Sequence, residues 1–254
     1  MTLNELDLYF NSFLKKEEFA ADPSRNGIQI QNSSPAGKEI TKVAFAVDAS
    51  LDTVNRAAEL GAQMLFVHHG IFWGGCETVT GIHYGRISAF IKSDIALYAS
   101  HLPLDANAEV GNNYGLARLA GLKELEPFGY WRGMQLGVKG RLETPVSIEK
   151  LSEMILPENK DTVLLPFGKK EISTVGIISG GGGSDYEQAL EAGLDAFITG
   201  EIGHEEYNPV KESGLNVIAG GHYATETAGV KLVMEKLMRE KGLEACFIDF
   251  PSGL

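Results

Sequence analysis

Short apolar segments alternate with helix-like segments along most of this chain, and this alternation constrains its fold more than any other feature. Apolar runs bounded by turn residues are typical of buried strands, and apolar residues at helical spacing are typical of helices packed on a sheet. The predicted strands span residues 43–47, 64–67, 95–99, 174–178, 196–199 and 217–221. The predicted helices span residues 51–60, 84–92, 113–119, 186–192, 205–212 and 225–241. Strands that alternate with helices predict an α/β fold with mainly parallel sheets and right-handed crossovers.

The alternation of strands and helices is interrupted once, over residues 124–171, and this segment separates a first series from a second. An amphipathic helix with a capping box at Thr2 and Glu5 is predicted over residues 2–19, and a last strand over residues 245–249. Between the two series, a strand, a helix and another strand form what we interpret as a small connector element. We therefore expect a first α/β lobe over residues 1–123, a short middle element over residues 124–171 and a second α/β lobe over residues 172–254.

The second series resembles a copy of the first. Glu59-Leu60-Gly61 precedes the strand that ends before His68, and Glu191-Ala192-Gly193 precedes the strand at residues 196–199. The alternative is a chance similarity between two strand–helix units, because the match is only a few residues deep. If the repeat is real, two similar lobes face each other and their strand ends converge on one cleft.

Histidines follow the predicted strands at the ends where α/β folds bind their ligands. His68 and His69 follow one strand, and His101 and His222 follow two others. Asp105 and Glu226 come four residues after the latter two histidines. Imidazole and carboxylate together suit zinc, manganese or iron. For the adjacent pair the alternative is a satisfied core histidine at 68 and a merely exposed one at 69.

The two carboxylates differ in their local setting. Glu226 falls at a predicted helix start, where a residue four positions after His222 shares its face. Asp105 follows Pro103, and because proline disfavours helix before it, we expect a loop to carry this carboxylate. A carboxylate can bridge two ions, so the set fits a dinuclear centre with positions left for water. The predicted metal ligands are His68, His69, Asp105, His222 and Glu226.

Further residues near these strand ends are candidates for catalysis or binding. His101, Glu201 and His204 are candidate acid–base residues or supports for the metal ligands, and a purely structural role is the alternative for Glu201 and His204. The glycine-rich stretch 179–184 could cradle a phosphate, but it lacks the lysine of a P-loop, and a tight turn is the favoured interpretation. Phe72 and Trp73 could stack on a base or cover the core, and we favour the cover.

Charge and composition exclude some classes of function. With 34 acidic and 22 basic residues the net charge is −12, which makes a nucleic-acid partner unlikely. Two cysteines far apart in sequence suggest a reducing compartment. No signal peptide and no membrane-spanning apolar run are found, so we expect a cytoplasmic protein.

Three segments resemble signatures of the NIF-three-like family, whose members are often called GTP cyclohydrolase 1 type 2 homologues. They are Val67-His68-His69-Gly70, the stretch from Ser100 to Ala106, and the stretch from Gly221 to Glu226. Asn26-Gly27-Ile28-Gln29 and Thr199-Gly200-Glu201 are also similar to family segments. The resemblance extends from about residue 20 to the C-terminus, although the middle segment is shorter here than in members with a larger inserted domain.

The resemblance implies two similar α/β lobes with a dinuclear metal centre between them and a ring-shaped homohexamer. It implies two divalent metal ions per chain, of zinc, iron, manganese or nickel, on the five ligands named above, with Glu226 as the bridge. His101 would be a ligand, a support for a ligand or a proton donor.

The resemblance also implies a function, a metal-dependent hydrolase of the GTP cyclohydrolase 1 type 2 kind with a small-molecule substrate. GTP is the candidate: a metal-activated water would open its guanine ring at C8 and release formate. One alternative is a non-catalytic metal-binding or scaffold protein, and another is a phosphoesterase acting on nucleotides or nucleic acid.

Overall fold

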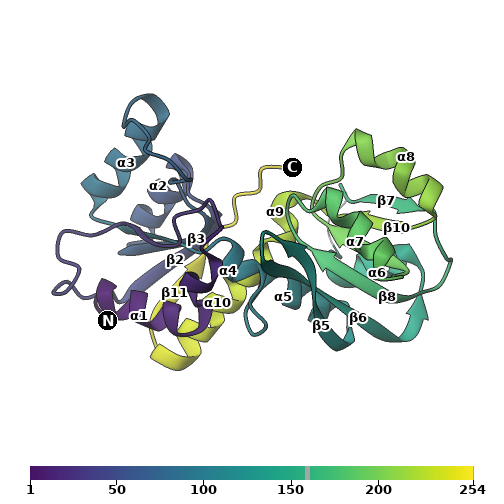
Figure 1. Ribbon diagram of the computed structural model, residues 1–254. Helices are drawn as coiled ribbons and strands as arrows, with labels where there is room; N and C mark the ends of the chain where they lie inside the picture. Colours follow the sequence, from purple (N-terminus) through teal and green to yellow (C-terminus); the bar gives the residue numbers. More distant parts are fainter. Residues whose placement is uncertain (158–160, 254) are drawn as a thin grey trace. The chain divides into compact units, whose positions relative to one another are not determined.

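The computed structural model describes residues 1–157 and 161–253, and it divides into two compact units. Unit 1 comprises residues 1–104 and 230–250, and unit 2 comprises residues 105–229 with the C-terminal tail from Pro251. Each unit combines a β-sheet with helices (Figure 1). The predicted α/β class is confirmed, with two sheets that contain many parallel strands.

The sheet of unit 1 is built from most of the first predicted series. In spatial order its strands are β1 (Gly27–Ile30), β4 (Ala96–Ala99), β3 (Met64–His69), β2 (Lys42–Asp48) and β11 (Glu244–Phe247). All neighbours are parallel except β1, which runs antiparallel to β4 along the edge. The register places Asp48 opposite His69. The carboxyl ends of β2 and β3 therefore deliver polar side chains to the same edge of the sheet.

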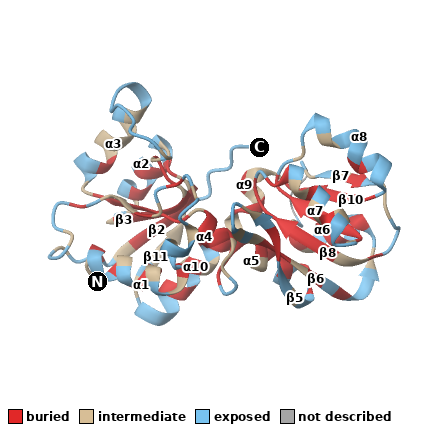
Figure 2. Cartoon of the chain, in the orientation of Figure 1, coloured by how far each residue is buried: buried red, intermediate tan, exposed pale blue. Residues whose placement is uncertain are grey.

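Helices of unit 1 cover a sheet whose inner strands β2, β3 and β4 are buried almost throughout (Figure 2). They are α1 (Leu3–Leu14), the 3-10 turn η1 (Lys16–Phe19), α2 (Leu51–Glu59), α3 (Gly81–Ser93), α4 (Leu102–Asp105) and most of α10 (Thr227–Lys241). The capping box of Thr2 and Glu5 is confirmed. The first helix is shorter than predicted, because Lys15 adopts a left-handed conformation with φ 51° and ends it.

The sheet of unit 2 is mixed. In spatial order its strands are β5 (Lys123–Trp131), β6 (Met134–Val146), β8 (Ile172–Ile178), β9 (Ala196–Thr199), β10 (Asn216–Ala219) and β7 (Val163–Pro166). The three strands β8, β9 and β10 are parallel, and antiparallel strands flank them on both sides. The parallel centre again brings strand carboxyl ends together, as the alternation predicted.

The other helices of unit 2 are short. They are α5 (Asn112–Leu119), α6 (Ile148–Ile155), the 3-10 turn η2 (Gly183–Asp185), α7 (Tyr186–Glu191), α8 (His204–Ser213) and α9 (His222–Thr225). Helices α5 and α6 pack with Val138, Val175 and Ile198 in one apolar cluster. That cluster holds β6, β8 and β9 under the two helices, so the segment predicted as a connector contributes to the core of the unit.

The division into units differs from the predicted domain boundaries 1–123, 124–171 and 172–254. Residues 244–247 pair in parallel with residues 42–45, so the C-terminal strand belongs to the first sheet. Residues 105–123 belong to unit 2. Strand β6 pairs with β8, which places the predicted middle element within the second sheet. Hydrogen-bonded partners across long sequence separations determine these boundaries, and strand periodicity alone does not identify partners.

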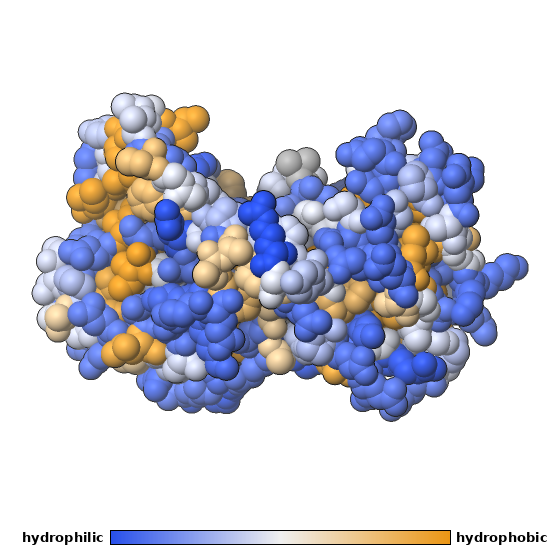
Figure 3. All heavy atoms as spheres, viewed as in Figure 1, coloured by the Kyte–Doolittle hydropathy of each residue, from blue (hydrophilic) through white to orange (hydrophobic). Residues whose placement is uncertain are grey.

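No described helix is both long enough and apolar enough to cross a lipid bilayer. Most of the visible surface is hydrophilic, and hydrophobic side chains gather around α3 (Figure 3). Those on α3 include Ile82, Tyr84 and Ile91, which are 79%, 58% and 64% exposed.

Candidate metal centre

Three histidines of unit 1 lie together at the carboxyl ends of β3 and β4. His68 and His69 are the last residues of β3, and His101 follows β4 after Ser100. One donor atom from each of the three side chains lies within 4.8 Å of the others. His68 is fully buried, whereas the side chains of His69 and His101 are each 18% exposed. We call these three residues the histidine triad.

Each ring of the histidine triad is oriented through its Nδ1 atom. The Nδ1 of His68 lies 2.9 Å from the carbonyl oxygen of Ser100, and the Nδ1 of His69 lies 2.8 Å from Asp48 Oδ1. The Nδ1 of His101 lies 2.9 Å from Asp22 Oδ1. A carbonyl or carboxylate oxygen accepts a hydrogen bond, so Nδ1 donates in each case and Nε2 carries the lone pair of the neutral ring. This is how proteins prepare histidines as metal ligands.

Asp22 is the most heavily supported of these partners. Its side chain is fully buried and also accepts hydrogen bonds from the backbone N–H of Ser24 and Leu102 and from the amide of Asn26. Burial opposes its ionisation, but these hydrogen bonds and the one from His101 keep its pKa below the usual value. An ionised Asp22 therefore holds the ring of His101.

A histidine of unit 2, His222, lies between two carboxylates. Its Nδ1 is 2.6 Å from Glu201 Oε1, and its Nε2 is 3.2 Å from Glu226 Oε1. Hydrogen bonding to Glu226, together with Glu201 and against the effect of burial, raises the pKa of His222 to about 9. The predicted common face of His222 and Glu226 is confirmed, because α9 places them one helical turn apart. A cation at this position would replace the proton on Nε2.

A tight turn after β8 leaves room for the carboxylate of Glu226. Gly180 has φ +63°, and its carbonyl oxygen accepts the backbone N–H groups of Gly200 and Glu201, both at 3.0 Å. A Cβ at Gly180 would overlap Glu226 Oε1 and lie 3.1 Å from His222 Nε2. The N–H of Gly180 donates to Thr225 Oγ1. This supports the tight-turn interpretation of the glycine-rich stretch.

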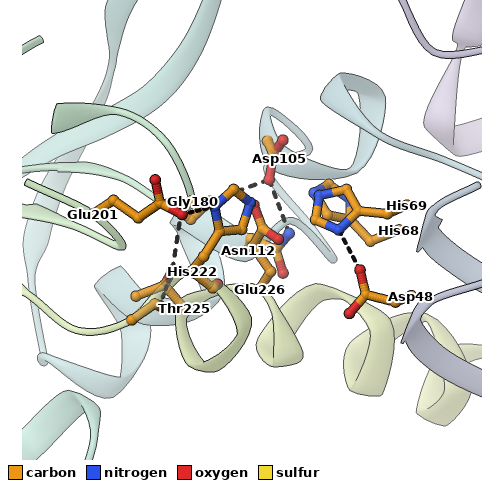
Figure 4. Close-up of polar contacts among 12 residues, drawn as sticks. Asp48, His68, His69, Asp105, Asn112, Gly180, Glu201, His222, Thr225 and Glu226 are labelled. Atoms are coloured by element: carbon orange, nitrogen blue, oxygen red, sulfur yellow. Dashed lines mark hydrogen bonds and ion pairs between the residues drawn. The ribbon is translucent and has the colours of Figure 1, made fainter. Parts of the chain in front are cut away.

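Asp105, the last residue of α4 and the first residue of unit 2, is buried (Figure 4). Its Oδ1 accepts hydrogen bonds from Asn112 Nδ2 at 2.9 Å and Ser179 Oγ at 3.1 Å. The expectation of a loop here was wrong, since Leu102–Asp105 forms one helical turn. Pro103 lies in the first turn, where its missing N–H has no helical partner to lose. Ser179 thus contacts Asp105, and the next residue, Gly180, abuts Glu226.

The remaining predicted residues have different settings. Glu201 contacts the ring of His222, which fits a support for a ligand. His204 is the first residue of α8 and is exposed. The predictions that His68, His69, Asp105, His222 and Glu226 serve one metal centre, and that His101, Glu201 and His204 act in catalysis or support the ligands, stay predictions.

Sequence reasoning missed Asp22, Asp48 and Asn112 as supports. Asp48 had a usable signal, because it follows the strand predicted over residues 43–47, and that strand pairs with the histidine strand in the structure. Asp22 had none beyond its place in a turn, since its contact with His101 spans 79 residues. Asn112 directly precedes the helix predicted over residues 113–119, and nothing in the sequence indicated its bond to Asp105.

Comparisons with known proteins agree over the whole chain. Residues 1–252 match the model of the family described as Duf34/NIF3 (NGG1p interacting factor 3). A "GTP cyclohydrolase 1 type 2 homolog" of Treponema pallidum is 43% identical over 100% of both chains, and one of Pyrococcus abyssi is 42% identical over 100% of both.

Solved structures also resemble the chain over nearly its whole length. TTHA1606 from Thermus thermophilus has a TM-score of 0.90 at 36% identity, and a structure described as "protein ybgI, unknown function" has 0.91 at 32%, each over 100% of both chains. Reduced HcgD from Methanocaldococcus jannaschii has a TM-score of 0.86 at 27% identity, over 98% of both chains.

Proposed function

Since the chain belongs to the Duf34/NIF3 family, we propose that it is a metal-dependent hydrolase with two divalent ions per chain. The observation that carries the proposal is the orientation of the histidine triad. Three imidazoles in mutual reach, each with an oxygen acceptor on Nδ1, present Nε2 lone pairs to one region. A purely structural histidine needs one satisfied bond, and it does not need two neighbours arranged in the same way.

The donor atoms fit first-row divalent metals. His68, His69 and His101 would offer imidazole nitrogens, and Asp105, His222 and Glu226 would offer two carboxylates and a further nitrogen. This mixture suits zinc, iron, manganese or nickel. A bound divalent ion would supply Lewis acidity and lower the pKa of a water molecule, which is the chemistry a hydrolase needs.

The chain's own residues would set the geometry for that chemistry. Asp48 and Asp22 hold the rings of His69 and His101 through Nδ1, so both rings would offer Nε2 to a bound metal. Glu201 does the same for His222. Among the predicted acid–base residues, His204 is exposed and is the candidate to exchange a proton with substrate. His101 would then serve as a ligand.

The substrate we propose is a small molecule, with GTP as the first candidate. The support is the name "GTP cyclohydrolase 1 type 2 homolog" given to the relatives. For GTP, hydrolysis at C8 of the guanine ring would consume water and release formate. The acidic net charge of −12 gives no support to nucleic acid as the main substrate.

Metal content per chain and formate release from GTP test the proposal together. Protein purified without added metal should contain about two divalent ions per chain if both donor sets are occupied, by analogy with two-metal hydrolases. His69→Ala and Glu226→Ala should each lose metal and turnover. His83→Gln is the matched control, because the His83 ring packs edge-on against Phe72 at 5.2 Å and lies outside the histidine triad.

Each outcome assigns a different function. Metal with formate release supports a cyclohydrolase. Metal without turnover of GTP or of a panel of phosphate esters supports a metal-binding or scaffold protein instead. Absence of metal after reloading contradicts the proposal. The proposed assembly into a homohexamer, which rests on the resemblance, is tested separately by sedimentation of the same sample.

A further inference from the structure

We propose that Trp73 is the stacking surface for a planar ring of the substrate, and that Arg25 supplies the counter-charge for an anionic group on the same molecule. The ligand class is thus an anionic heteroaromatic compound, such as a purine nucleotide. The inference rests on the proposed function, because the site it extends is the histidine triad. It concerns residues of unit 1 alone.

Trp73 borders the histidine triad and remains accessible. The centroid of its ring system lies 4.9 Å from that of His101 in an edge-on arrangement, and 5.9 Å from that of His69. The residue is 37% exposed. Its indole Nε1–H donates to the carbonyl oxygen of Gly70 at 3.0 Å, which fixes the ring. A fixed, partly exposed aromatic ring beside candidate metal ligands is suited to stacking.

The neighbouring aromatic residue shows what a covering role looks like. Phe72 packs against the hydrophobic cluster that contains Leu65, Val67 and Phe90, and its ring contacts His83. The sequence interpretation favoured such a cover for Trp73 as well. The structure separates the two residues, since Phe72 covers the core and Trp73 meets the histidines.

Arg25 lies in a segment that pairs with the loop containing Trp73. The backbone of residues 23–25 pairs with that of residues 72–74 through Arg25 N–H to Phe72 O at 3.1 Å and Gly74 N–H to Pro23 O at 2.6 Å. Ser24 and Trp73 are direct antiparallel partners. The guanidinium of Arg25 donates to the carbonyl oxygen of Gly74 at 2.5 Å. No carboxylate within residues 1–157 or 161–253 pairs with this exposed cation.

The pairing of these features points to the ligand class. Any planar base can stack on a tryptophan ring, so Trp73 would select for an aromatic ring without selecting for a particular base. An arginine without an acidic partner favours a phosphate or carboxylate group. The net charge of −12 repels anions, so a local cation matters for binding one. Both residues are joined to the triad, Trp73 by ring contact and the Arg25 segment through Asp22 and His101.

Tryptophan fluorescence tests the stacking directly. The chain has two tryptophans, and Trp131 lies beside Arg132 with the guanidinium 4.5 Å from the ring centroid. In metal-loaded full-length Trp131→Phe protein, Trp73 is the sole tryptophan, and excitation selective for tryptophan reports on it alone. Guanosine and GTP should quench its emission in a saturable way, and ribose 5-phosphate should quench it little because it has no base. Equal quenching of Trp131 in the Trp73→Phe protein would overturn the assignment.

Affinities of the variants then separate the two roles. Trp73→Leu should weaken guanosine and GTP binding about 10-fold or more, the range expected for loss of base stacking, and Trp73→Phe should retain most of it. Arg25→Gln should weaken GTP and ribose 5-phosphate but leave guanosine unchanged. Trp131→Phe and Arg132→Gln, the matched tryptophan–arginine pair, should leave all three affinities unchanged. Metal content is measured on every variant, so that a substitution that disrupts metal binding by the histidine triad is detected.

Failure of this inference and failure of the hydrolase proposal give different results. Unchanged affinity in Trp73→Leu protein that still turns over substrate would overturn the stacking role and leave the hydrolase intact. Binding that depends on Trp73 without any turnover would support the stacking role and contradict the hydrolase. If none of the three ligands binds the metal-loaded protein, the proposed ligand class is wrong.

Discussion

Asp48 and His69 occupy paired positions at the ends of the parallel strands β2 and β3, and Asp48 Oδ1 lies 2.8 Å from His69 Nδ1. The register of the sheet therefore sets the orientation of a candidate metal ligand. Because β2 and β3 are buried over most of their length, this register is strongly specified.

Asp48→Asn should loosen His69 without unfolding the protein. The amide can present its N–H₂ group to the ring, which removes the preference for a proton on Nδ1. Loss of such a support typically costs about 10- to 100-fold in metal affinity. Competition with a metal-binding dye measures the change. Asp52→Asn, an exposed position in the first turn of α2, is the control and should bind metal like the wild type.

Gly180→Ala should disturb the Glu226 and His222 pair. The added Cβ would overlap Glu226 Oε1, and a left-handed alanine is itself strained by roughly 1 kcal/mol. Gly193→Ala is a matched control, since Gly193 has φ +65° and nothing within 4 Å of an added Cβ. Both variants should lose similar stability from the backbone, and Gly180→Ala alone should lose metal. Equal metal binding by the two would contradict the steric argument.

Asn112→Ala should destabilise unit 2. The buried Asn112 amide donates to Asp105 Oδ1, and its carbonyl oxygen accepts the N–H of Gly229 at 2.7 Å. Removing a partner from buried polar groups costs about 1–3 kcal/mol each. Urea unfolding followed by circular dichroism gives the change in free energy. Asn208→Ala, exposed on α8, should stay within about 0.5 kcal/mol of the wild type.

Asp94 should make stability depend on pH in the acid range. Hydrogen bonds from Lys38 and from the N–H and hydroxyl of Ser33 lower its pKa from 3.8 to about 2. A folded-state pKa below the unfolded value contributes stability above about pH 4 that is lost as the pH falls towards 2. Unfolding free energies of the wild type and Asp94→Asn should therefore converge between pH 4 and 2. A gap that stays constant would show that Asp94 has no such role.

The sequence predicted local structure and the residues at strand ends, because both depend on neighbours in the chain. Strand alternation located β2, β3, β4, β8, β9 and β10, and a spacing of four residues placed Glu226 on the face of His222. Lys123–Trp131 was missed as a strand. It is the edge strand beside β6, many of its residues are exposed, and its register shifts between Lys123 and Glu126, so it shows no clear periodicity.

Long-range partners were beyond the reach of sequence patterns. Asp22 lies in a turn, and nothing nearby in the chain shows that it holds His101. The pairing of the edge strand β11 with β2 was also not predictable, because the two strands lie about 200 residues apart in the sequence and begin at Glu244 and Lys42. Contacts of this kind depend on how the whole unit packs, so they become visible only in three dimensions.

The pairing of β11 with β2 has a consequence for the order in which the halves can form. Unit 2 draws every strand of its sheet from one continuous stretch between Lys123 and Ala219. The sheet of unit 1 is complete only when residues 244–247 have been synthesised, because they form its edge strand β11. During synthesis the second sheet can therefore close first, and the half that carries the histidine triad is the later one to complete. Shortening the chain at its C-terminus would accordingly harm the N-terminal half.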